Sequence, residues 1–425
     1  MSEKRYGLIG RRLGHSLSPE IHAHFGSYPY ELVELEPEAL SAFLERGTLA
    51  GFNVTIPYKE VVCARCDELS ERAARIGAVN TVLRRDDGTL YGDNTDYDGF
   101  LYLCRQSKLD FRGVHVLVLG SGGAAKTVCA VLEDLGARAT IVSRSGPVTY
   151  ERATLLTDVE VIVNTTPVGM YPVLDESPLA SLSAWPKLRA VLELIYNPAH
   201  TRLMMMAEAR GLIAINGLGM LVSQALAAAN RWMGIREDDT LVARVTHTVE
   251  CDARNLILVG MPGAGKSTLG KRLAEVLERP FIDLDALVSE CQGRTAAEII
   301  REDGETAFRA VESATLKRAL LLRRAVIATG GGTVLAEENR TLMRQNATVL
   351  WLKRPLDSLP IEGRPLSVAQ GVAALAEQRY PLYESVADAV VDVQDALAQT
   401  LDATLALLKQ APRHVKVLKN GSESL

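Results

Sequence analysis

Short apolar runs alternate with amphipathic segments along most of this 425-residue chain. A short apolar run predicts a buried strand, whereas apolar residues three and four positions apart predict a helix. On this pattern we expect strands at Tyr6–Ile9, Glu31–Leu35, Gly51–Thr55 and Val114–Val118, and a helix at Ala124–Leu135. Strands that alternate with helices in this way are typical of α/β proteins with largely parallel sheets.

Three further apolar runs follow that helix, namely "ATIVSR", "VEVIVNTTPVGM" and "AVLELIY", and they predict a Rossmann-like sheet that binds a nucleotide. A helix of small and apolar residues is predicted at Gly217–Gly234, where it should pack back on the first α/β unit. Residues 58–79, "YKEVVCARCDELSERAARIGAV", also have a helical pattern.

A third α/β unit begins at Leu256, after the polar segment "THTVECDAR". The chain is long enough for about three domains of roughly 150 residues. We therefore predict an α/β protein with this organisation: a first unit at 1–100 to which residues 217–245 return, a Rossmann-like unit at 101–216, a connector at 246–254, a third unit with a parallel sheet at 255–410, and a frayed tail at 411–425.

The composition is ordinary, with 47% hydrophobic residues and a formal net charge of -5. It lacks the basic excess of a nucleic-acid-binding protein. Neither a signal-peptide pattern nor an apolar run of about 20 residues is present, so we expect a cytoplasmic protein without a membrane partner. The six cysteines are too scattered for a disulfide framework, and we expect Cys63 and Cys66 to pack within a helix rather than to bind metal.

Two glycine-rich turns could hold phosphate groups. The second, Gly260–Ser267, fits G-x-x-x-x-G-K-[ST], follows an apolar strand and precedes a helix, which is the context of a P-loop. We expect the Lys266 side chain to reach the terminal phosphates of ATP and the Ser267 hydroxyl to bind Mg²⁺. The remaining predicted contacts to ATP are Gly263, Ala264, Gly265 and Thr268.

The acceptor side of this site is expected near "FIDLDALV". If the strand continues there, Asp283 and Asp285 lie on one face, so that one carboxylate serves the metal and the other meets an acceptor hydroxyl. Alternatively, both aspartates cap a helix. The later strand "AVIATGGG" ends in Thr329 rather than in an acidic residue, so the metal would depend on Asp283.

Residues 255–408 resemble shikimate kinases, because the P-loop, the D-x-D pair, "GETAFRAVE", "TGGG", "GRPL" and "EQRYPLYESVAD" occur in that family's order. The resemblance implies that Asp285 orients or deprotonates the 3-hydroxyl of shikimate, that Glu312 steers the arginines and that Arg364, in a lid shorter than in relatives, reaches the transferring phosphate. It implies these contacts to the substrate: Arg309 and Arg379 at the carboxylate, and Gly330, Gly331 and Gly332 against the ring.

The first 240 residues resemble shikimate dehydrogenases through "GHSLSP", "GFNVTIPYK", "IGAVNT", "GDNTD", "NTTPVGM" and "GLGMLVSQA". The resemblance implies that Lys59 and Asp96 flank the reacting oxygen, with Lys59 as the acid–base group. It implies these further contacts to the substrate: Ser16 and Ser18 at the carboxylate, Thr55, Asn80 and Gln224 at the ring hydroxyls, and Tyr196 at the carboxylate end.

The dinucleotide of this half is expected to be NADP, because the strand "ATIVSRS" ends without the acidic residue that grips an NAD ribose and presents Arg144 instead. Little chain remains for the helix and strand that relatives place next, so this half looks trimmed. For His15, His22 and His24 we expect a role at a helix start rather than at a metal. The predicted cofactor contacts are Gly120, Ser121, Gly122, Gly123, Ala124, Ser143, Arg144, Leu194 and Gly217.

Together, the two resemblances predict a bifunctional enzyme of aromatic amino acid biosynthesis. Its first half would reduce 3-dehydroshikimate to shikimate with NADPH, and its second would phosphorylate shikimate with MgATP. One alternative makes one half a regulatory module that binds shikimate or nucleotide, and another makes quinate the acceptor. The expected partners are small molecules, and the chain is expected to be a monomer or a homodimer.

Overall fold

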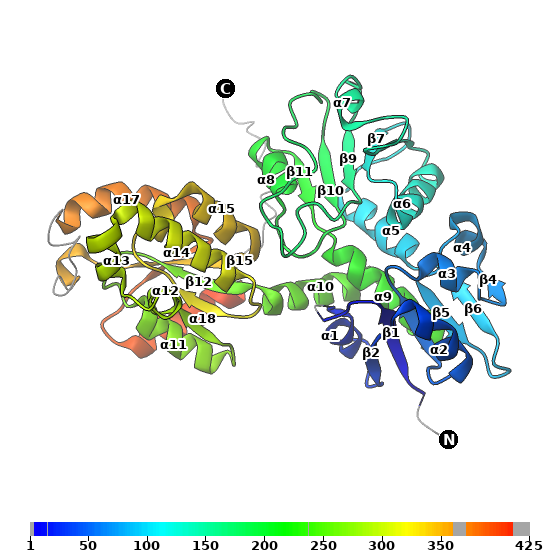
Figure 1. Ribbon diagram of the computed structural model, residues 1–425, viewed down its shortest axis with the longest axis horizontal. Coiled ribbons are helices and arrows are strands. Elements are labelled where there is room, and N and C mark those ends of the chain that lie inside the picture. The colour runs from blue at the N-terminus through cyan, green and yellow to red at the C-terminus, as the bar shows by residue number, and fades with distance from the viewer. Residues whose placement is uncertain (1–3, 15, 237, 360–370, 411–425) are drawn as a thin grey trace, which may run out of the picture. The chain divides into compact units, whose positions relative to one another are not determined.

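The computed structural model describes residues 4–14, 16–236, 238–359 and 371–410 (Figure 1). His15, the predicted lid residue Arg364 with its "GRPL" motif, and the tail at 411–425 lie outside the described residues. The chain divides into two compact units. The first comprises the described residues of 1–196 and 201–251, and the second those of 197–200 and 252–410.

The first sheet of the first unit has six strands in the order β2-β1-β3-β5-β6-β4. Its strands are β1 (Tyr6–Gly10), β2 (Tyr30–Glu34), β3 (Gly51–Val54), β4 (Glu68–Leu69), β5 (Thr81–Arg84) and β6 (Leu90–Asp93). The first three are parallel to one another, whereas β5 is antiparallel to both β3 and β6. The helices of this part are α1 (Ser18–Ala23), η1 (Pro37–Ala39), α2 (Leu40–Arg46), α3 (Lys59–Cys63) and α4 (Glu71–Ile76).

The helical prediction for residues 58–79 is correct only at its two ends, where α3 and α4 lie. Between them Asp67 pairs with Leu90, since the Asp67 N–H donates to the Leu90 carbonyl (2.9 Å) and the Leu90 N–H donates to Asp67 Oδ2 (2.8 Å). Ser70 then begins α4 as its N-cap. Strand pairing with a distant residue has therefore overridden the local helical pattern.

The second sheet of this unit is entirely parallel, in the order β11-β10-β9-β7-β8. Its strands are β7 (His115–Leu119), β8 (Arg138–Val142), β9 (Val161–Asn164), β10 (Ala190–Glu193) and β11 (Ile213–Ile215). Alternate residues of β7 enter two cores, one shared with α5 (Asp96–Gln106) and α6 (Gly123–Asp134), the other with α7 (Tyr150–Ala153) and α8 (Arg202–Ala209). This confirms the predicted Rossmann-like sheet.

The connection from β8 to β9 contains one helix, α7, which has four residues. Strand β8 is the edge of the sheet on that side. The prediction that this half lacks a longer helix and a further strand is therefore confirmed.

Helix α9 (Leu218–Met233) packs against α1, α5 and β5, which confirms the predicted return to the first sheet. The Trp232 indole donates to the Val82 carbonyl (2.9 Å) and stacks on the ring of Tyr6 at 5.2 Å. Helix α10 (Asp239–Ala253) follows, so residues 246–253 of the expected connector are helical.

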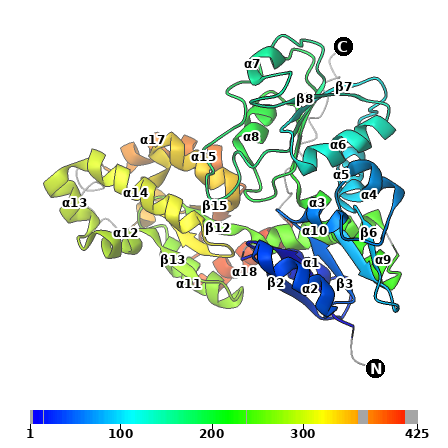
Figure 2. The same ribbon diagram turned by 45° about the vertical axis from the view of Figure 1, so that its right-hand side comes forward.

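The second unit is a parallel sheet in the order β13-β14-β12-β15-β16. Its strands are β12 (Asn255–Val259), β13 (Phe281–Asp283), β14 (Val326–Ala328), β15 (Ala347–Lys353) and β16 (Ala389–Asp392). Helices α14, α15 and α17 lie on one side of it, and α11 and α18 lie on the other (Figures 1 and 2). The helices of this unit are α11 (Lys266–Val276), α12 (Leu284–Gln292), α13 (Ala296–Asp303), α14 (Glu305–Leu320), η2 (Thr333–Leu335), α15 (Glu337–Asn346), η3 (Leu356–Ser358), α17 (Val372–Val386) and α18 (Leu397–Gln410).

The longest helices are too short to cross a membrane. Helices α9 and α14 have 16 residues each, fewer than the roughly 20 apolar residues that cross a bilayer. Within the described part of the chain, no helix has both the length and the hydropathy of a membrane span.

Two candidate active sites

The first candidate site centres on an ion pair. Lys59 is the first residue of α3 and Asp96 the first residue of α5, and the Lys59 ammonium donates to Asp96 Oδ2 at 2.5 Å. Both side chains are mostly buried, with 24% and 15% of their surfaces exposed. The two residues singled out for proton transfer are thus in direct contact, in a setting where an ion pair is poorly screened.

Asn80 holds the other oxygen of this aspartate. Its Nδ2 donates to Asp96 Oδ1 at 2.9 Å and to Gln224 Oε1 of α9 at 3.3 Å. The structure therefore brings four predicted residues together, three from the helices α3, α5 and α9 and Asn80 from the turn before β5. The Asn80 amide on Oδ1 and the Lys59 ammonium on Oδ2 together fix how the Asp96 carboxylate lies.

The predicted carboxylate-binding serines lie at the start of α1. The Ser16 hydroxyl donates to Ser18 Oγ (3.2 Å) and accepts from the Ser18 N–H (3.2 Å). Thr55 follows β3, which is parallel to β1, so the chain segments after both strands lie at one edge of the sheet. Tyr196 packs against the apolar cluster that contains Leu17. Within the described residues, no hydrogen bond joins the serines or Thr55 to the Lys59–Asp96 pair.

The predicted helix-start role is wrong for His22 and His24. His22 lies in the last turn of α1 and His24 is its C-cap. The buried His22 ring stacks on Tyr30 at 3.9 Å and lies 2.7 Å from the Tyr28 hydroxyl, and burial lowers its pKa to about 3. It is therefore a neutral member of an aromatic core. In the part of the chain that the structure describes, no three His, Cys, Asp or Glu residues are placed to hold a metal ion.

The first glycine-rich loop joins β7 to α6. Gly120 has φ +107°, and a Cβ there would lie 2.7 Å from Thr165 Oγ1, so only glycine fits. By contrast, a Cβ on Gly122 or Gly123, at the start of α6, would have no atom within 4 Å. The loop, which also contains Ser121 and Ala124, thus leaves open space at a helix N-terminus, which fits a nucleotide phosphate.

The remaining predicted cofactor residues border the same edge of the sheet. Ser143 is buried after β8, where its N–H donates to the Val148 carbonyl (3.1 Å), and Arg144 beside it is exposed. A Cβ on Gly217 would lie 2.1 Å from the Leu194 carbonyl oxygen, so these two residues touch. An exposed guanidinium beyond the second strand suits a ribose 2′-phosphate.

The second candidate site begins with the P-loop between β12 and α11. Gly260, Gly263 and Gly265 all have positive φ values, of +145°, +85° and +93°. The Lys266 ammonium donates to the carbonyls of Gly260 (2.9 Å) and Met261 (3.0 Å). The lysine therefore lies within its own loop, and phosphate oxygens would replace those carbonyls as its partners.

The two carboxylate oxygens of Asp283 have different hydrogen-bond donors. Its Oδ2 accepts from the Ser267 hydroxyl at 2.6 Å, while its Oδ1 accepts from the N–H groups of Asp285 and Ala286 and so caps α12. The helix begins at Leu284, so the prediction that both aspartates share one face of a strand is wrong, and the alternative of a helix cap is correct for Asp283. The Ser267 hydroxyl and the Asp283 carboxylate, which are in contact, fit Mg²⁺. This ion usually takes only a few ligands from the protein and the others from phosphate and water.

Asp285 lies in the first turn of α12, close to another carboxylate. Burial, then the negative charges of Glu312 and Asp283, raises its pKa. A Cβ on Gly330 would lie 2.9 Å from both Asp285 Oδ1 and Glu312 Oε1. A carboxylate with a raised pKa beside bare glycine backbone is suited to accept a proton from a bound hydroxyl.

The arginines border the same glycines. Arg309 donates to Glu312 (2.8 Å) and Glu305 (2.9 Å), and Glu312 in turn accepts from the Thr333 hydroxyl (2.6 Å). Arg379 is 3% exposed and lies beside Tyr383, whose hydroxyl donates to the Gly331 carbonyl at 2.5 Å. Among the described residues, no group accepts from the buried Nε atoms of these two arginines, so an anionic ligand would satisfy them.

Sequence models of two protein families match the chain. Residues 262–409 match shikimate kinase, and residues 8–82 match the shikimate dehydrogenase substrate-binding domain. The NADP(+) shikimate dehydrogenase of Clostridium perfringens strain SM101 is 37% identical over an alignment of 270 residues, which covers 58% of this chain and 99% of the relative. That of Rhodospirillum rubrum is 40% identical over 274 residues, with 56% and 95% covered. The chain belongs to the shikimate dehydrogenase family. It also carries a shikimate kinase domain and is therefore a fusion of the two.

Solved structures agree with the dehydrogenase region. A chorismate mutase/shikimate 5-dehydrogenase fusion protein from Clostridium acetobutylicum matches with a TM-score of 0.56 and 36% identity, over 59% of this chain and 98% of its own. The shikimate 5-dehydrogenase of Thermus thermophilus, solved with NADP(H) and shikimate, matches with a TM-score of 0.53 and 32% identity, over 58% of this chain and 99% of its own.

Sequence reasoning missed one buried acid in the dehydrogenase region. Glu193, at the end of β10, is fully buried and accepts from Asn164 Nδ2 (2.9 and 3.0 Å), the Ile195 N–H (3.2 Å) and the Thr201 hydroxyl (3.1 Å). It thereby fixes the segment that carries Leu194 and Tyr196. The sequence signal was a single acidic residue in "AVLELIY", a run that is otherwise apolar.

Burial also raises the pKa of Glu193 from 4.5 to about 7. The neutral Glu193 side chain therefore stabilises the folded state. This stabilisation is complete below pH 4.5 and is lost as the pH rises through 7. Relative to Glu193→Gln, the wild-type free energy of unfolding should therefore fall by up to roughly 3 kcal/mol between about pH 5 and pH 8. Denaturant unfolding followed by tryptophan fluorescence measures this, with the exposed Glu176→Gln as control. Equal pH dependence in wild type and Glu193→Gln would contradict the assignment.

In the kinase domain, Gly332→Ala should weaken substrate binding. The backbone there is ordinary (φ -102°), but a Cβ would lie 2.4 Å from Arg309 Nη2. Because Glu305 and Glu312 hold this guanidinium, it must leave its position. We expect the KM for shikimate to rise roughly 10- to 100-fold, as for a lost charged hydrogen bond, with the KM for MgATP unchanged. Steady-state kinetics with each substrate varied measures both, and a change confined to MgATP would count against Arg309 as the carboxylate contact.

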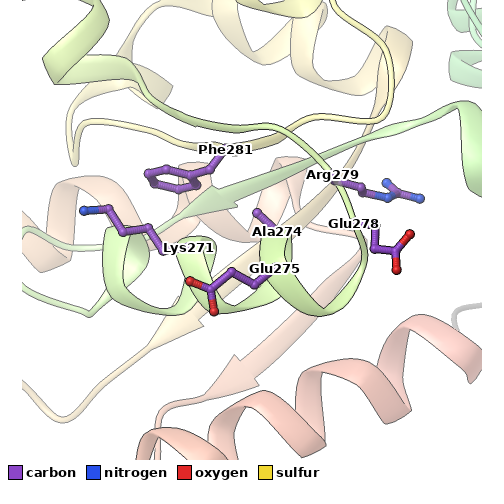
Figure 3. Close-up of a pocket in the computed structure, with 6 residues that line it drawn as sticks. All are labelled: Lys271, Ala274, Glu275, Glu278, Arg279 and Phe281. Atoms are coloured by element: carbon purple, nitrogen blue, oxygen red, sulfur yellow. The ribbon is translucent and has the colours of Figure 1, made fainter.

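The kinase domain also has a surface hollow, whose lining residues are shown in Figure 3. It has a volume of about 310 Å³, and its lining comes from α11, from the turn that follows this helix and from Phe281, the first residue of β13. Lys271 and Phe281 lie on one side of it, and Glu278 and Arg279 on the other. None of the predicted site residues is among the residues that line it.

Proposed function

We propose that the dehydrogenase region reduces 3-dehydroshikimate to shikimate with NADPH, and that the kinase domain phosphorylates the 3-hydroxyl of shikimate with MgATP. The proposal is carried by the presence, in one polypeptide, of a proton-transfer pair in the first region and a P-loop beside a carboxylate–arginine cluster in the second. We propose no further partner, and the chain would act as a monomer or a homodimer.

In the first reaction, bound NADPH would supply the hydride. The Lys59 ammonium would give its proton to the oxygen that becomes the new ring hydroxyl, while Asp96 holds the lysine in place. Ser16 and Ser18 would bind the carboxylate, and Thr55, Asn80, Tyr196 and Gln224 would orient the ring. The contact between Lys59 and Asp96 supports this, since the donor is already held at 2.5 Å by the residue that orients it.

In the second reaction, Asp285 would accept the proton of the 3-hydroxyl. Arg309 and Arg379 would hold the carboxylate, and the three glycines after β14 would let the ring lie against backbone. Lys266 would turn from the Gly260 and Met261 carbonyls to the phosphates, and Ser267 and Asp283 would hold Mg²⁺. The raised pKa of Asp285 supports its role as the base.

A coupled assay tests the whole proposal. Purified protein with 3-dehydroshikimate, NADPH and MgATP should yield shikimate 3-phosphate, and omission of ATP should stop the reaction at shikimate. Accumulation of shikimate in the presence of MgATP would show that the second half does not phosphorylate it. Replacement of shikimate by quinate, and of NADPH by NADH, in separate assays tests the acceptor and the dinucleotide.

A further inference from the structure

Behind Asn80 lies a cluster of polar side chains that water does not reach. Asn53 of β3, Thr81 of β5 and Thr95 of the turn before α5 are 4%, 1% and 0% exposed. They do not belong to the predicted substrate contacts. Buried polar groups must satisfy one another, so their hydrogen bonds have fixed directions.

The Asn80 amide can lie only one way round in this cluster. Its Oδ1 accepts from the Thr95 N–H at 2.6 Å, and its Nδ2 faces the acceptor oxygens of Asp96 and Gln224. A flipped amide would set donor against donor at Thr95 and acceptor against acceptor at Asp96. The cluster therefore decides which end of Asn80 meets the Asp96 carboxylate.

Thr81 completes this arrangement. The Tyr30 hydroxyl donates to Asn53 Oδ1 (2.9 Å), which leaves Asn53 Nδ2 to donate to Thr81 Oγ1 (3.0 Å). Thr81 accepts from Asn53, so its single proton is left for Asn80 Oδ1 (3.1 Å) or for Thr95 Oγ1 (2.8 Å). In the second case the Thr95 hydroxyl donates to Asn80 Oδ1 (3.2 Å) instead. In both cases Asn80 Oδ1 accepts a hydrogen bond from one threonine hydroxyl.

We propose that Thr81 is a positioning residue of the dehydrogenase reaction, which acts through Asn80 to hold Asp96 Oδ1 and so leaves Oδ2 for Lys59. The proposal rests on the proposed function of that site. Groups that orient a catalytic residue without touching the substrate commonly change the rate about tenfold or more when they are removed. The expected effect is therefore on turnover rather than on binding.

The test compares Thr81→Val, which keeps the shape but removes the hydroxyl, with Thr81→Ser, which keeps the hydroxyl. In the full-length protein, kcat for oxidation of shikimate by NADP should fall about tenfold in Thr81→Val, and the acid limb of its pH profile should shift. The KM for NADP should stay within about twofold, and Thr81→Ser should restore most of kcat. Thermal unfolding checks that each variant is folded.

A second variant, Asn53→Asp, tests the same chain of bonds independently. It keeps the volume but replaces the donor that faces Thr81 by an acceptor, which draws the Thr81 proton away from Asn80. We again expect a loss of kcat. The proposal is overturned if Thr81→Val keeps wild-type kcat and pH profile, if Thr81→Ser is as slow as Thr81→Val, or if folded Asn53→Asp is unaffected. If the wild type itself does not oxidise shikimate, the proposed function fails instead.

Discussion

Replacement of Lys59 by alanine is expected to lower kcat for reduction of 3-dehydroshikimate by roughly 10²- to 10⁴-fold, the usual contribution of a general acid. The lysine is the only partner that the structure gives to Asp96 Oδ2 among the described residues, and its ammonium is mostly buried. Without it, water would have to deliver the proton into a site where Asp96 repels the developing alkoxide.

The measurement is NADPH consumption under saturating substrate, together with phosphorylation of added shikimate by the same preparation. The second rate should equal that of the wild type, because the kinase domain has its own core and its own substrate site. Lys187→Ala, an exposed lysine of the same region, serves as the matched control and should keep full activity. If Lys59→Ala kept more than a tenth of the wild-type kcat, Lys59 would not be the acid.

Features encoded in contiguous sequence were predictable. The P-loop, the first glycine turn and the strands that lead into them depend on apolar runs and on glycines with positive φ, and the structure places both loops at helix N-termini as expected. The contact between Lys59 and Asp96, which are 37 residues apart, was expected only from the resemblance to shikimate dehydrogenases. In the structure it follows from antiparallel pairing, which places the end of β3, the start of β5 and the end of β6 at one edge of the sheet.

Features that depend on distant partners were not predictable. Pairing of Asp67 with Leu90, for example, breaks the helix expected at 58–79. The role of Thr81 is invisible in sequence, because it depends on donors from β3 and on the turn before α5. The break in the helix at Asp67 and the role of Thr81 both depend on hydrogen bonds between separate elements. The cap at Asp283 is local by contrast, because its donors lie two and three residues ahead, and the sequence offered it as one of two alternatives.

Lys266→Ala should have the converse effect to Lys59→Ala. We expect kcat/KM for MgATP to fall by roughly 10²- to 10³-fold, as when one preorganised electrostatic contact to a reacting group is lost, while reduction of 3-dehydroshikimate continues at the wild-type rate. The lysine is 7% exposed and its ammonium lies on the Gly260 and Met261 carbonyls, so it is held within reach of any phosphate that enters the loop.

The experiment measures ADP formation against MgATP concentration at saturating shikimate. Lys271→Ala is the matched control, since Lys271 lies on the same helix but is exposed and lines the hollow beyond the P-loop. Removal of Lys266 also takes a donor away from the carbonyls of Gly260 and Met261, although the Met261 carbonyl still accepts from the Ala264 N–H (3.1 Å). Thermal unfolding must therefore show that the domain is still folded. A folded Lys266→Ala protein that phosphorylates shikimate at the wild-type rate would mean that the nucleotide does not depend on this loop. The glycine backbone offers N–H dipoles but no full positive charge to the phosphoryl group that is transferred. Such a result would therefore assign this contact to another lysine or arginine of the kinase domain.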